Sequence, residues 1–365
     1  LEGRKMEEYI NIRVDVLRKF TVAVLKKLGV PAKDAEIAVD VLIVADQRGI
    51  DSHGLQRFKR YTDGLQAGVM KPITEVKILK ETPNTLLISG GDGLGQVVSY
   101  RTMKLVIDKA LKNNVAFAAV RDSNHYGIAG YYSMMALEHD LIGISVTNTA
   151  PLVVPTFGKD AVVGTNPVSI AVPAGKERPF VLDMATSTVT RGKVEVYGRE
   201  GKTMPITWAT DELGRATQDI PRVLDNWLAK RGGGLLPLGG VEEESGGHKG
   251  YGLSLAIDIL SGVLSGSAFG PNLYAKKDVP AKVSHFFGAI KIDAFIEPAL
   301  FKSMMDKYIN ILKNSEKAAG RDRIYIHGEK EFELYEQRKE EVPLYYEVVN
   351  ELRQVGQEVD ITVPF

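Results

Sequence analysis

The sequence of 365 residues predicts an α/β fold: a mixed or parallel sheet with helices on its faces and mainly helical segments at both ends of the chain. Strand-length apolar segments alternate with amphipathic helices between residues 96 and 148, and apolar residues recur at helical spacing near both ends. No repeat or low-complexity linker separates these regions. We therefore expect intertwined units, with a helical part at residues 1–80 and 300–365 and an α/β part at residues 81–299.

The amino-terminal part begins with two predicted helices, "VDVLRKFTVAVLKKLG" (14–29) and "AKDAEIAVDVLIVADQRG" (32–49). Gly29 and Pro31 separate them, because glycine commonly ends a helix and proline fits the first turn of the next. A third, short helix follows at 57–68. The alternating segment 75–90 predicts a hairpin of two short strands around Pro83-Asn84.

The remaining helices and strands are predicted from the spacing of apolar residues. Segments whose apolar residues recur every three or four positions predict helices, and short apolar runs predict buried strands. The predicted helices are 96–114, 131–140, 248–266, 298–316 and the region 330–355, and the predicted strands are 115–122, 141–148, 283–292 and several within 150–185.

Composition excludes several classes of protein. Lys plus Arg equals Asp plus Glu at 46 each, whereas proteins that bind nucleic acids or anionic membranes usually carry excess positive charge. The chain has no cysteine, which removes disulfides, thiolate catalysis and cysteine-bound metal. No uncharged apolar run reaches the roughly 18–20 residues of a membrane span. We expect a cytoplasmic enzyme, with a binding or interaction protein as the rival.

Several segments look like familiar motifs but lack a residue that the motif requires. "ISGGDGLGQVV" follows a predicted strand, but the third glycine of a dinucleotide fingerprint is replaced by Gln96 or Val98, depending on the starting glycine. "GKT" at 201–203 is no P-loop, because Val196 stands where the upstream glycine is needed. No H-E-x-x-H or G-x-S-x-G motif is present. We therefore expect neither an ordinary Rossmann loop, nor a metal, nor an acyl-transfer serine.

Two histidines have similar surroundings. His53 lies in "RGIDSHGLQR" and His125 in "DSNHYGIAGYY", each after a polar residue and before a glycine, where a regular element gives way to a loop. Each could simply be a neighbour of a helix cap formed by Ser52 or Asn124. As a pair in a chain without thiols they favour proton transfer, because the ordinary pKa of histidine lies near neutrality. His139 and His285 lack such surroundings and are predicted to be structural or surface residues.

Charged residues near glycines and strand ends are further candidates. Arg57, four residues after His53, is either a carboxylate clamp or a solvated arginine, and Arg48 is a second candidate. Asp183, at the end of an apolar strand, is either a cap or a ligand-binding carboxylate. His248 and Lys249 stand between glycines at the start of a helix, where an anion would be stabilised. The turn at 327–329 is a further pocket candidate.

Taken together, these motifs resemble those of the type-2 malate/L-lactate dehydrogenases, and most closely the malate dehydrogenase branch, from about residue 10 to residue 350. The order of the motifs carries the resemblance: "RGIDSHGLQR", "DSNHYGIAGYY", "TNTAPLVVPTFG", "GTNPVSIAVP", "LDMATST", "GGHKGYGL" with "DILSG", and "IHGEKEF".

The resemblance implies a nicotinamide cofactor, NAD with NADP as the alternative, on a non-Rossmann mixed-sheet dehydrogenase fold. It also implies a homodimer with the active site near the subunit interface. The family's catalytic histidine falls on His125 or His53, its carboxylate-binding arginine on Arg57, and a neighbouring contact on Ser52. Its cofactor contacts fall on His125, Thr149, Asp183, Met184, Ala185, His248, Lys249, Gly328 and Glu329.

Three functions remain open at this point. The first is hydride transfer between the cofactor and a 2-hydroxy acid, malate to oxaloacetate, with His125 as the acid/base, Arg57 on the carboxylate, and Ser52 and His53 on the hydroxyl side or in a proton relay. The second is the same chemistry on another substrate of the family, of the lactate, sulfolactate, ureidoglycolate or cyclic imine type. The third is a non-catalytic binding protein on this fold. Substrate-side residues are expected in the helical part and nicotinamide-binding residues in the α/β part.

Overall fold

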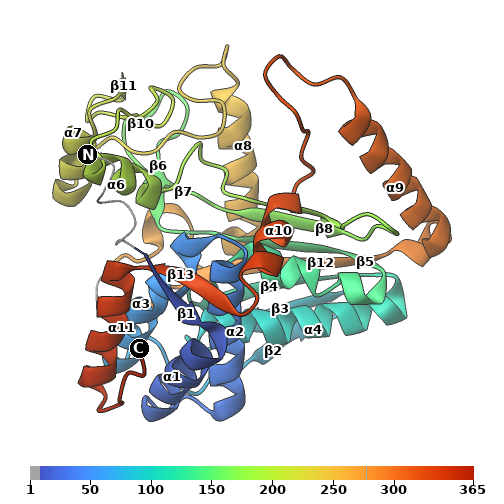
Figure 1. Cartoon of the computed structure of the whole chain (residues 1–365), viewed down its shortest axis with the longest axis horizontal. Coiled ribbons are helices and arrows are strands. Elements are labelled where there is room, and N and C mark those ends of the chain that lie inside the picture. Colours follow the sequence, from blue (N-terminus) through green and yellow to red (C-terminus); the bar gives the residue numbers. More distant parts are fainter. Residues whose placement is uncertain (1–8, 277) are drawn as a thin grey trace.

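The computed structural model describes residues 9–276 and 278–365, and a seven-stranded sheet lies at its centre (Figure 1). The strand order is β2-β3-β4-β12-β5-β8-β9; β3 pairs parallel with β4, and the other neighbours in this sheet pair antiparallel. The prediction of an α/β fold with a mixed sheet and helical ends is confirmed. The strands are β2 Lys77–Glu81, β3 Thr85–Ser89, β4 Val115–Ser123, β5 Leu141–Thr147, β8 Val168–Val172, β9 Phe180–Met184 and β12 Val283–Lys291.

Two helices cover one face of this sheet. α4 (Gly95–Asn113) packs on β4 and β12, and α5 (Ala129–Met134) packs on β5 and β8. Val98, Val106 and Ala110 of α4 recur at helical spacing and are completely buried, which explains why the sequence predicts this helix well. α5 is shorter than the predicted helix 131–140, because the chain continues as a separate 3-10 turn and Asp140 then takes a left-handed conformation.

A second apolar core joins both ends of the chain. Its helices contribute stripes of buried residues, such as Leu17 and Val24 of α1. The region 330–355, predicted as helical, contains a strand, β13, that pairs antiparallel with β1. Val342 and Leu344 alternate inward along β13, and this pairing spans almost the whole chain, so local spacing did not reveal it. The elements are β1 Tyr9–Arg13, α1 Val14–Lys27, α2 Ala32–Gln47, α3 Phe58–Gln66, β13 Glu341–Tyr345 and α11 Tyr346–Glu358.

A third, smaller core lies beyond the carboxyl-terminal end of β5. It contains Val153, Val163, Val223 and Leu235, and Trp208 packs against it. The predicted strands within 150–185 are present as β6 to β9. The additional elements here are β6 Pro151–Val153, β7 Val163–Gly164, α6 Arg191–Arg199, β10 Ala209–Thr210, β11 Ala216–Thr217, α7 Ile220–Ala229 and α8 Gly247–Asp258, which continues into a π-helical turn at Ile259–Val263.

The helices α9 (Pro298–Asn314) and α10 (Glu329–Gln337) differ in how they pack. α10 lies beside the carboxyl end of α2, whereas α9 stands away from the sheet (Figure 1). Ile309 is the one buried residue of α9. Across the described ranges 9–276 and 278–365, no helix is both long and apolar enough to cross a membrane.

Candidate active site

His53 and His125, separated by 72 positions in the sequence, lie together. Their rings are stacked, with centroids 5.5 Å apart and an interplanar angle of 26°. The Nδ1 atom of each ring contacts a hydroxyl: Ser52 Oγ lies 2.9 Å from His53 Nδ1, and Tyr61 Oη lies 2.5 Å from His125 Nδ1. Neither Nε2 atom makes a hydrogen bond to any residue in 9–276 or 278–365. Both imidazoles therefore keep one ring nitrogen free for a ligand.

The local chain around His53 is held by a buried carboxylate. His53 ends a 3-10 turn (Asp51–His53) after α2, and a second turn (Leu55–Arg57) follows Gly54. The Asp46 carboxylate accepts a hydrogen bond from the Leu55 amide at 2.8 Å, and a Cβ at Gly54 would collide with it. Burial raises the pKa of Asp46 well above its usual range. The glycine after His53 thus permits close packing on Asp46, rather than the approach of a ligand.

Both histidines are neutral near pH 7. Burial, followed by the charges of Arg57 and Arg60, lowers the pKa of His53 to about 4. Burial also holds the pKa of His125 well below its ordinary value, with Arg60 and His53 contributing. A neutral imidazole with a free nitrogen is able to accept a proton from a hydroxyl group.

Two arginines lie beside the histidine pair. Arg57 donates through Nε to the Ser52 carbonyl at 2.8 Å, and its Nη2 atom lies near the start of α6, next to Gly192. Arg60 donates to the Tyr274 hydroxyl at 2.6 Å. Within the described part of the chain no carboxylate lies within ion-pair distance of either guanidinium. The two cations are therefore available to an anionic ligand.

Asp183 and the Gly328 turn line a cavity of about 240 Å³ together with Arg48. Asp183 Oδ2 accepts a hydrogen bond from the Gly130 amide at 2.7 Å, while Oδ1 has no partner in the described chain. Burial raises the pKa of Asp183 to about 6. Gly328 takes a left-handed conformation with its α-carbon against Val181. The structure thus brings together two of the sequence candidates that lie far apart in the chain.

Glu329 does not line this cavity, although its neighbour Gly328 does. Its buried carboxylate lies 2.8 Å from Lys313 Nζ and 3.0 Å from Arg323 Nη2, and it accepts a hydrogen bond from the Ile326 amide. These contacts hold the start of α10, so the side chain is engaged within the protein. Gly328, rather than Glu329, lines the cavity.

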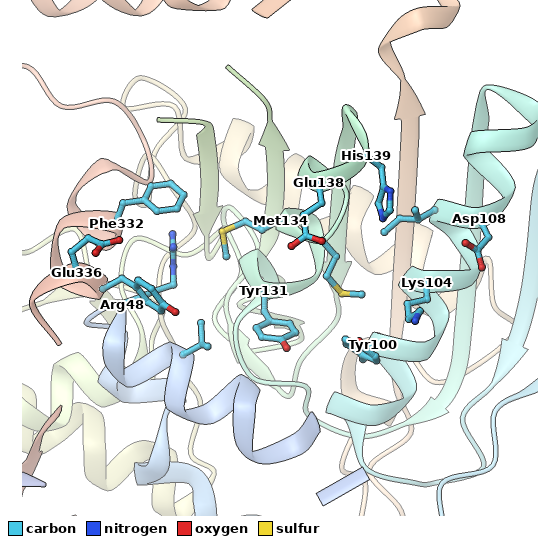
Figure 2. A pocket seen from close by; sticks show the side chains of 14 residues that line it. Arg48, Tyr100, Lys104, Asp108, Tyr131, Met134, Glu138, His139, Phe332 and Glu336 are labelled. Atoms are coloured by element: carbon cyan, nitrogen blue, oxygen red, sulfur yellow. The ribbon is translucent and has the colours of Figure 1, made fainter. Parts of the chain in front are cut away.

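A larger cavity of about 640 Å³ adjoins this one at Arg48, which lines both (Figure 2). The Arg48 guanidinium lies 4.5 Å from the centre of the Phe332 ring. Figure 2 shows Tyr131 and Met134 of α5 between this pair and Lys104 of α4. No salt bridge to Arg48 occurs among the residues that the structure describes. The Arg48 guanidinium as a donor, the open oxygen of Asp183 as an acceptor and the aromatic ring of Phe332 together suit a nucleotide.

Thr149 follows the end of β5, and Met184 and Ala185 lie at the end of β9; β8 separates these two strands in the sheet. Thr149 Oγ1 accepts a hydrogen bond from the Thr165 amide at 2.8 Å, and Thr186, the residue after Ala185, donates through its amide to the Thr165 carbonyl at 2.9 Å. Asn166 links these ends to α8 by donating to the Ser254 carbonyl. His248 and Lys249 lie exposed in the first turn of α8, and within residues 9–276 and 278–365 no hydrogen bond, ion pair or ring contact joins them to the histidine pair.

Sequence reasoning missed three residues of this site. Arg60 lies three positions after Arg57 in "QRFKR", so helical spacing could have indicated it. Tyr61 and Gln96 carried no local signal. His285, predicted to be a structural or surface residue, is fully buried within β12, in agreement with a structural role. No group of three or more His, Asp or Glu side chains in 9–276 and 278–365 is arranged to hold a metal ion.

Comparison with known proteins places this geometry in a family. A family model described as malate/L-lactate dehydrogenase matches residues 12–353. The chain belongs to the malate/L-lactate dehydrogenase family. It is 48% identical to a malate dehydrogenase of Pyrococcus abyssi over 361 residues, covering 99% of this chain and 98% of the relative. It is 38% identical to an L-sulfolactate dehydrogenase of Methanocaldococcus jannaschii, covering 95% and 96%.

Solved structures of the family share the same fold. The malate dehydrogenase of Entamoeba histolytica superposes with a TM-score of 0.94 at 37% identity, covering 98% of this chain and all of that one. The malate dehydrogenase of Pyrococcus horikoshii OT3 gives 0.88 at 45% identity, covering 98% and 97%. The predicted family and its dehydrogenase fold are confirmed.

Proposed function

We propose that the protein oxidises malate to oxaloacetate with NAD, NADP being the alternative cofactor. The observation that carries the proposal is the stacked pair of His53 and His125 near two arginines; in the described chain their Nε2 atoms have no hydrogen-bond partner and the arginines have no carboxylate partner. Similarity to malate dehydrogenases over nearly the whole chain supports the choice of substrate.

The chain's own residues supply acid/base chemistry and binding. His125 takes the proton of the substrate hydroxyl at Nε2, where the neutral ring has a lone pair. Arg57 holds the adjacent carboxylate, and Ser52 with His53 contacts the hydroxyl side or relays the proton. When bound, a nicotinamide cofactor supplies the acceptor for the hydride from C2.

The cofactor-binding residues are part of the same proposal. The open Oδ1 of Asp183 suits a ribose hydroxyl, and Arg48 suits a phosphate. Met184 and Ala185 directly follow Asp183 in the chain, and Thr149 lies just after the end of β5. The complete proposed set is His125, Thr149, Asp183, Met184, Ala185, His248, Lys249, Gly328 and, through its backbone, Glu329.

Two cations rather than one favour a substrate with two acidic groups. After burial, the positive charges of Arg57 and Arg60 both lower the pKa of His53, and Arg57 donates a hydrogen bond to the carbonyl of Ser52, the residue before His53. This arrangement suits malate or sulfolactate better than lactate, ureidoglycolate or a cyclic imine. The relative named L-sulfolactate dehydrogenase supports sulfolactate as the second candidate.

The test is a substrate panel with both cofactors. Absorbance of NADH and NADPH is followed with oxaloacetate, sulfopyruvate, pyruvate and a cyclic imine, and the highest kcat/KM is expected with oxaloacetate. Arg57→Ala is expected to raise the KM for malate by about 100-fold, because a charge-assisted bidentate contact is lost. Absence of turnover with every substrate would favour a non-catalytic binding protein.

We also propose a homodimer that covers two exposed apolar stripes. Leu300, Met304, Tyr308 and Ile311 follow one face of α9 and are 55–59% exposed. Ile259, Leu260, Val263 and Leu264 form a second stripe after α8. Monomers rarely leave apolar surfaces of this extent in water.

Light scattering during gel filtration tests the dimer. Leu264→Glu combined with Met304→Glu is expected to give a monomer, because two charges would be buried in the interface. Leu228→Glu is the matched control, because Leu228 is 83% exposed on α7, apart from both stripes. A monomeric wild type would contradict this part of the proposal.

The proposal also covers the division of the chain into two parts and the location of the enzyme in the cell. Residues 1–80 and 300–365 carry the substrate-side groups, and residues 81–299 carry most of the nicotinamide-binding groups. The enzyme works in the cytoplasm. Fractionation of cells with antibodies against the protein tests the second statement, and recovery in a membrane or extracellular fraction would contradict it.

A further inference from the structure

We infer that Tyr61, held by Gln96, is a positioning residue that keeps the proton of neutral His125 on Nδ1 and so leaves Nε2 free to act as the base; this inference rests on the proposed function. The observations are the contact between Tyr61 and His125, the complete burial of the groups behind it, and the packing of α4 on the loop that carries His125.

The contact joins distant parts of the chain. Tyr61 Oη lies 2.5 Å from His125 Nδ1, and the two residues are 64 positions apart. Tyr61 is 2% exposed in the middle of α3, so its ring cannot change position without repacking the amino-terminal core. Ser52, which contacts His53, is by contrast a small neighbour in the same turn.

Gln96 lies behind the tyrosine. It is completely buried at the start of α4, and neither its amide nitrogen nor its amide oxygen has a hydrogen-bond partner in the described chain, while it acts to lower the pKa of Tyr61. A buried carboxamide without partners costs about 1–3 kcal/mol, so a contact with Tyr61 is strongly favoured. Because a Cβ at Gly95 would collide with the carbonyls of Asn124 and His125, α4 packs directly on the His125 loop.

The direction of the chain of hydrogen bonds follows from the chemistry. To take a proton at Nε2, neutral His125 must carry its hydrogen on Nδ1 and donate it to Tyr61 Oη. The inferred acceptor for the tyrosine's own hydrogen is Gln96 Oε1, a buried oxygen that has no other partner in the described chain. When the substrate O–H bond breaks, an Nε2–H bond forms, and the resulting imidazolium keeps its Nδ1–H bonded to Tyr61.

Without Tyr61 the other tautomer of neutral His125 is favoured. The Gly127 amide lies 3.4 Å from His125 Nδ1 and is oriented to donate to it. In Tyr61→Phe this donor is the remaining partner of Nδ1, and it favours the tautomer with the hydrogen on Nε2. That tautomer has no lone pair directed at the substrate hydroxyl.

The first experiment measures the tautomer directly. Histidine labelled with ¹⁵N in the full-length protein is observed by NMR, and His125 is assigned from the spectrum of His125→Gln. Wild type is expected to carry the hydrogen on Nδ1, and Tyr61→Phe to shift toward Nε2. An Nε2–H tautomer in wild type, or an unchanged tautomer in Tyr61→Phe, would overturn the inference whether or not malate is the substrate.

The second experiment separates positioning from folding. Tyr61→Phe is expected to lower kcat for malate oxidation by about 100-fold, the lower end of general-base contributions, with KM changed less than about twofold. It should also move the acid limb of the kcat/KM profile to lower pH. Gln96→Leu should give a smaller loss, about 10-fold.

Tyr126→Phe is the matched control. Tyr126 is 1% exposed, adjoins His125 in sequence and contacts Ser145 Oγ at 3.3 Å, so it tests the loss of a buried hydroxyl alone. Its kcat and acid limb should stay at wild-type values. Equal losses in Tyr61→Phe and Tyr126→Phe would show that Tyr61 is only structural. If wild type does not oxidise malate, the proposed function fails while the NMR result still stands.

Discussion

His285 and the pair His53 and His125 lie in two regions that differ in how the ring nitrogens are paired; His285 is fully buried, whereas His53 and His125 are partly buried. His285 lies within β12, is fully buried and stacks on Tyr126 with ring centroids 4.5 Å apart. Both its nitrogens are paired, Nδ1 with Thr147 Oγ1 at 2.7 Å and Nε2 with Ser123 Oγ at 2.8 Å. His53 and His125 are paired through Nδ1, and neither Nε2 atom has a hydrogen-bond partner in the part of the chain that the structure describes. A fully paired histidine stabilises the sheet, whereas a half-paired one retains a nitrogen for chemistry.

The largest effect is expected from His125→Gln. Glutamine has no basic nitrogen, so kcat for malate oxidation should fall by about 1000-fold or more, within the range of general-base contributions. Steady-state kinetics with malate and NAD measure it. The matched His285→Gln should retain kcat within about threefold at pH 8. A similar loss in both variants would break the distinction between the two regions.

His285→Gln should instead affect stability. Replacing the ring removes its stacking on Tyr126 and disturbs two hydrogen bonds, leaving Ser123 or Thr147 without a full partner. The free energy of unfolding should fall by about 2–4 kcal/mol, measured by urea denaturation at pH 8. A change below about 0.5 kcal/mol would show that the paired histidine contributes little to the sheet.

The pH dependence of stability provides a smaller test. Burial lowers the pKa of His285 to about 3, below its ordinary value of 6.5. Between these values the unfolded chain binds the extra proton, so this stabilisation is complete above pH 6.5 and is lost as the pH falls, by about 1.4 kcal/mol per pH unit. Asp183 acts in the opposite sense, because its folded pKa of about 6 exceeds its ordinary value.

The comparison of variants isolates the contribution of His285. The slope of unfolding free energy against pH between 6 and 4 should be smaller in His285→Gln than in wild type by about 1.4 kcal/mol per unit. Urea titrations at three pH values measure this slope. Identical slopes would mean that His285 is protonated in the folded state.

The smallest effect is expected from Ser52→Ala. Ser52 contacts His53 from the adjacent position, and the 3-10 turn with Asp46 still holds the backbone. We expect kcat to fall about 3- to 10-fold, because one neutral hydrogen bond is worth about 1 kcal/mol. Steady-state kinetics measure it. A loss as large as that of His125→Gln would make Ser52 a catalytic group in its own right.

Much of the fold followed from local patterns. The helices 14–27, 32–47 and 95–113 and the hairpin around Pro83-Asn84 appear where spacing predicts them. The strand β13 did not follow, because its partner β1 lies at the opposite end of the chain. The same limit applies to the site. The spacing of Arg57 from His53 in the sequence predicted it, whereas Tyr61 became relevant only through its contact with His125.

The sequence by itself determined the family, the residue types of the chemistry and the periodic elements, because motifs and periodicity are properties of neighbours within a few positions. The tertiary structure decided which histidine nitrogens are free, which cations remain unpaired, and that the Glu329 carboxylate is engaged with Lys313 and Arg323. These properties depend on burial and on contacts across tens or hundreds of residues. They arise only when the packed core brings distant segments together.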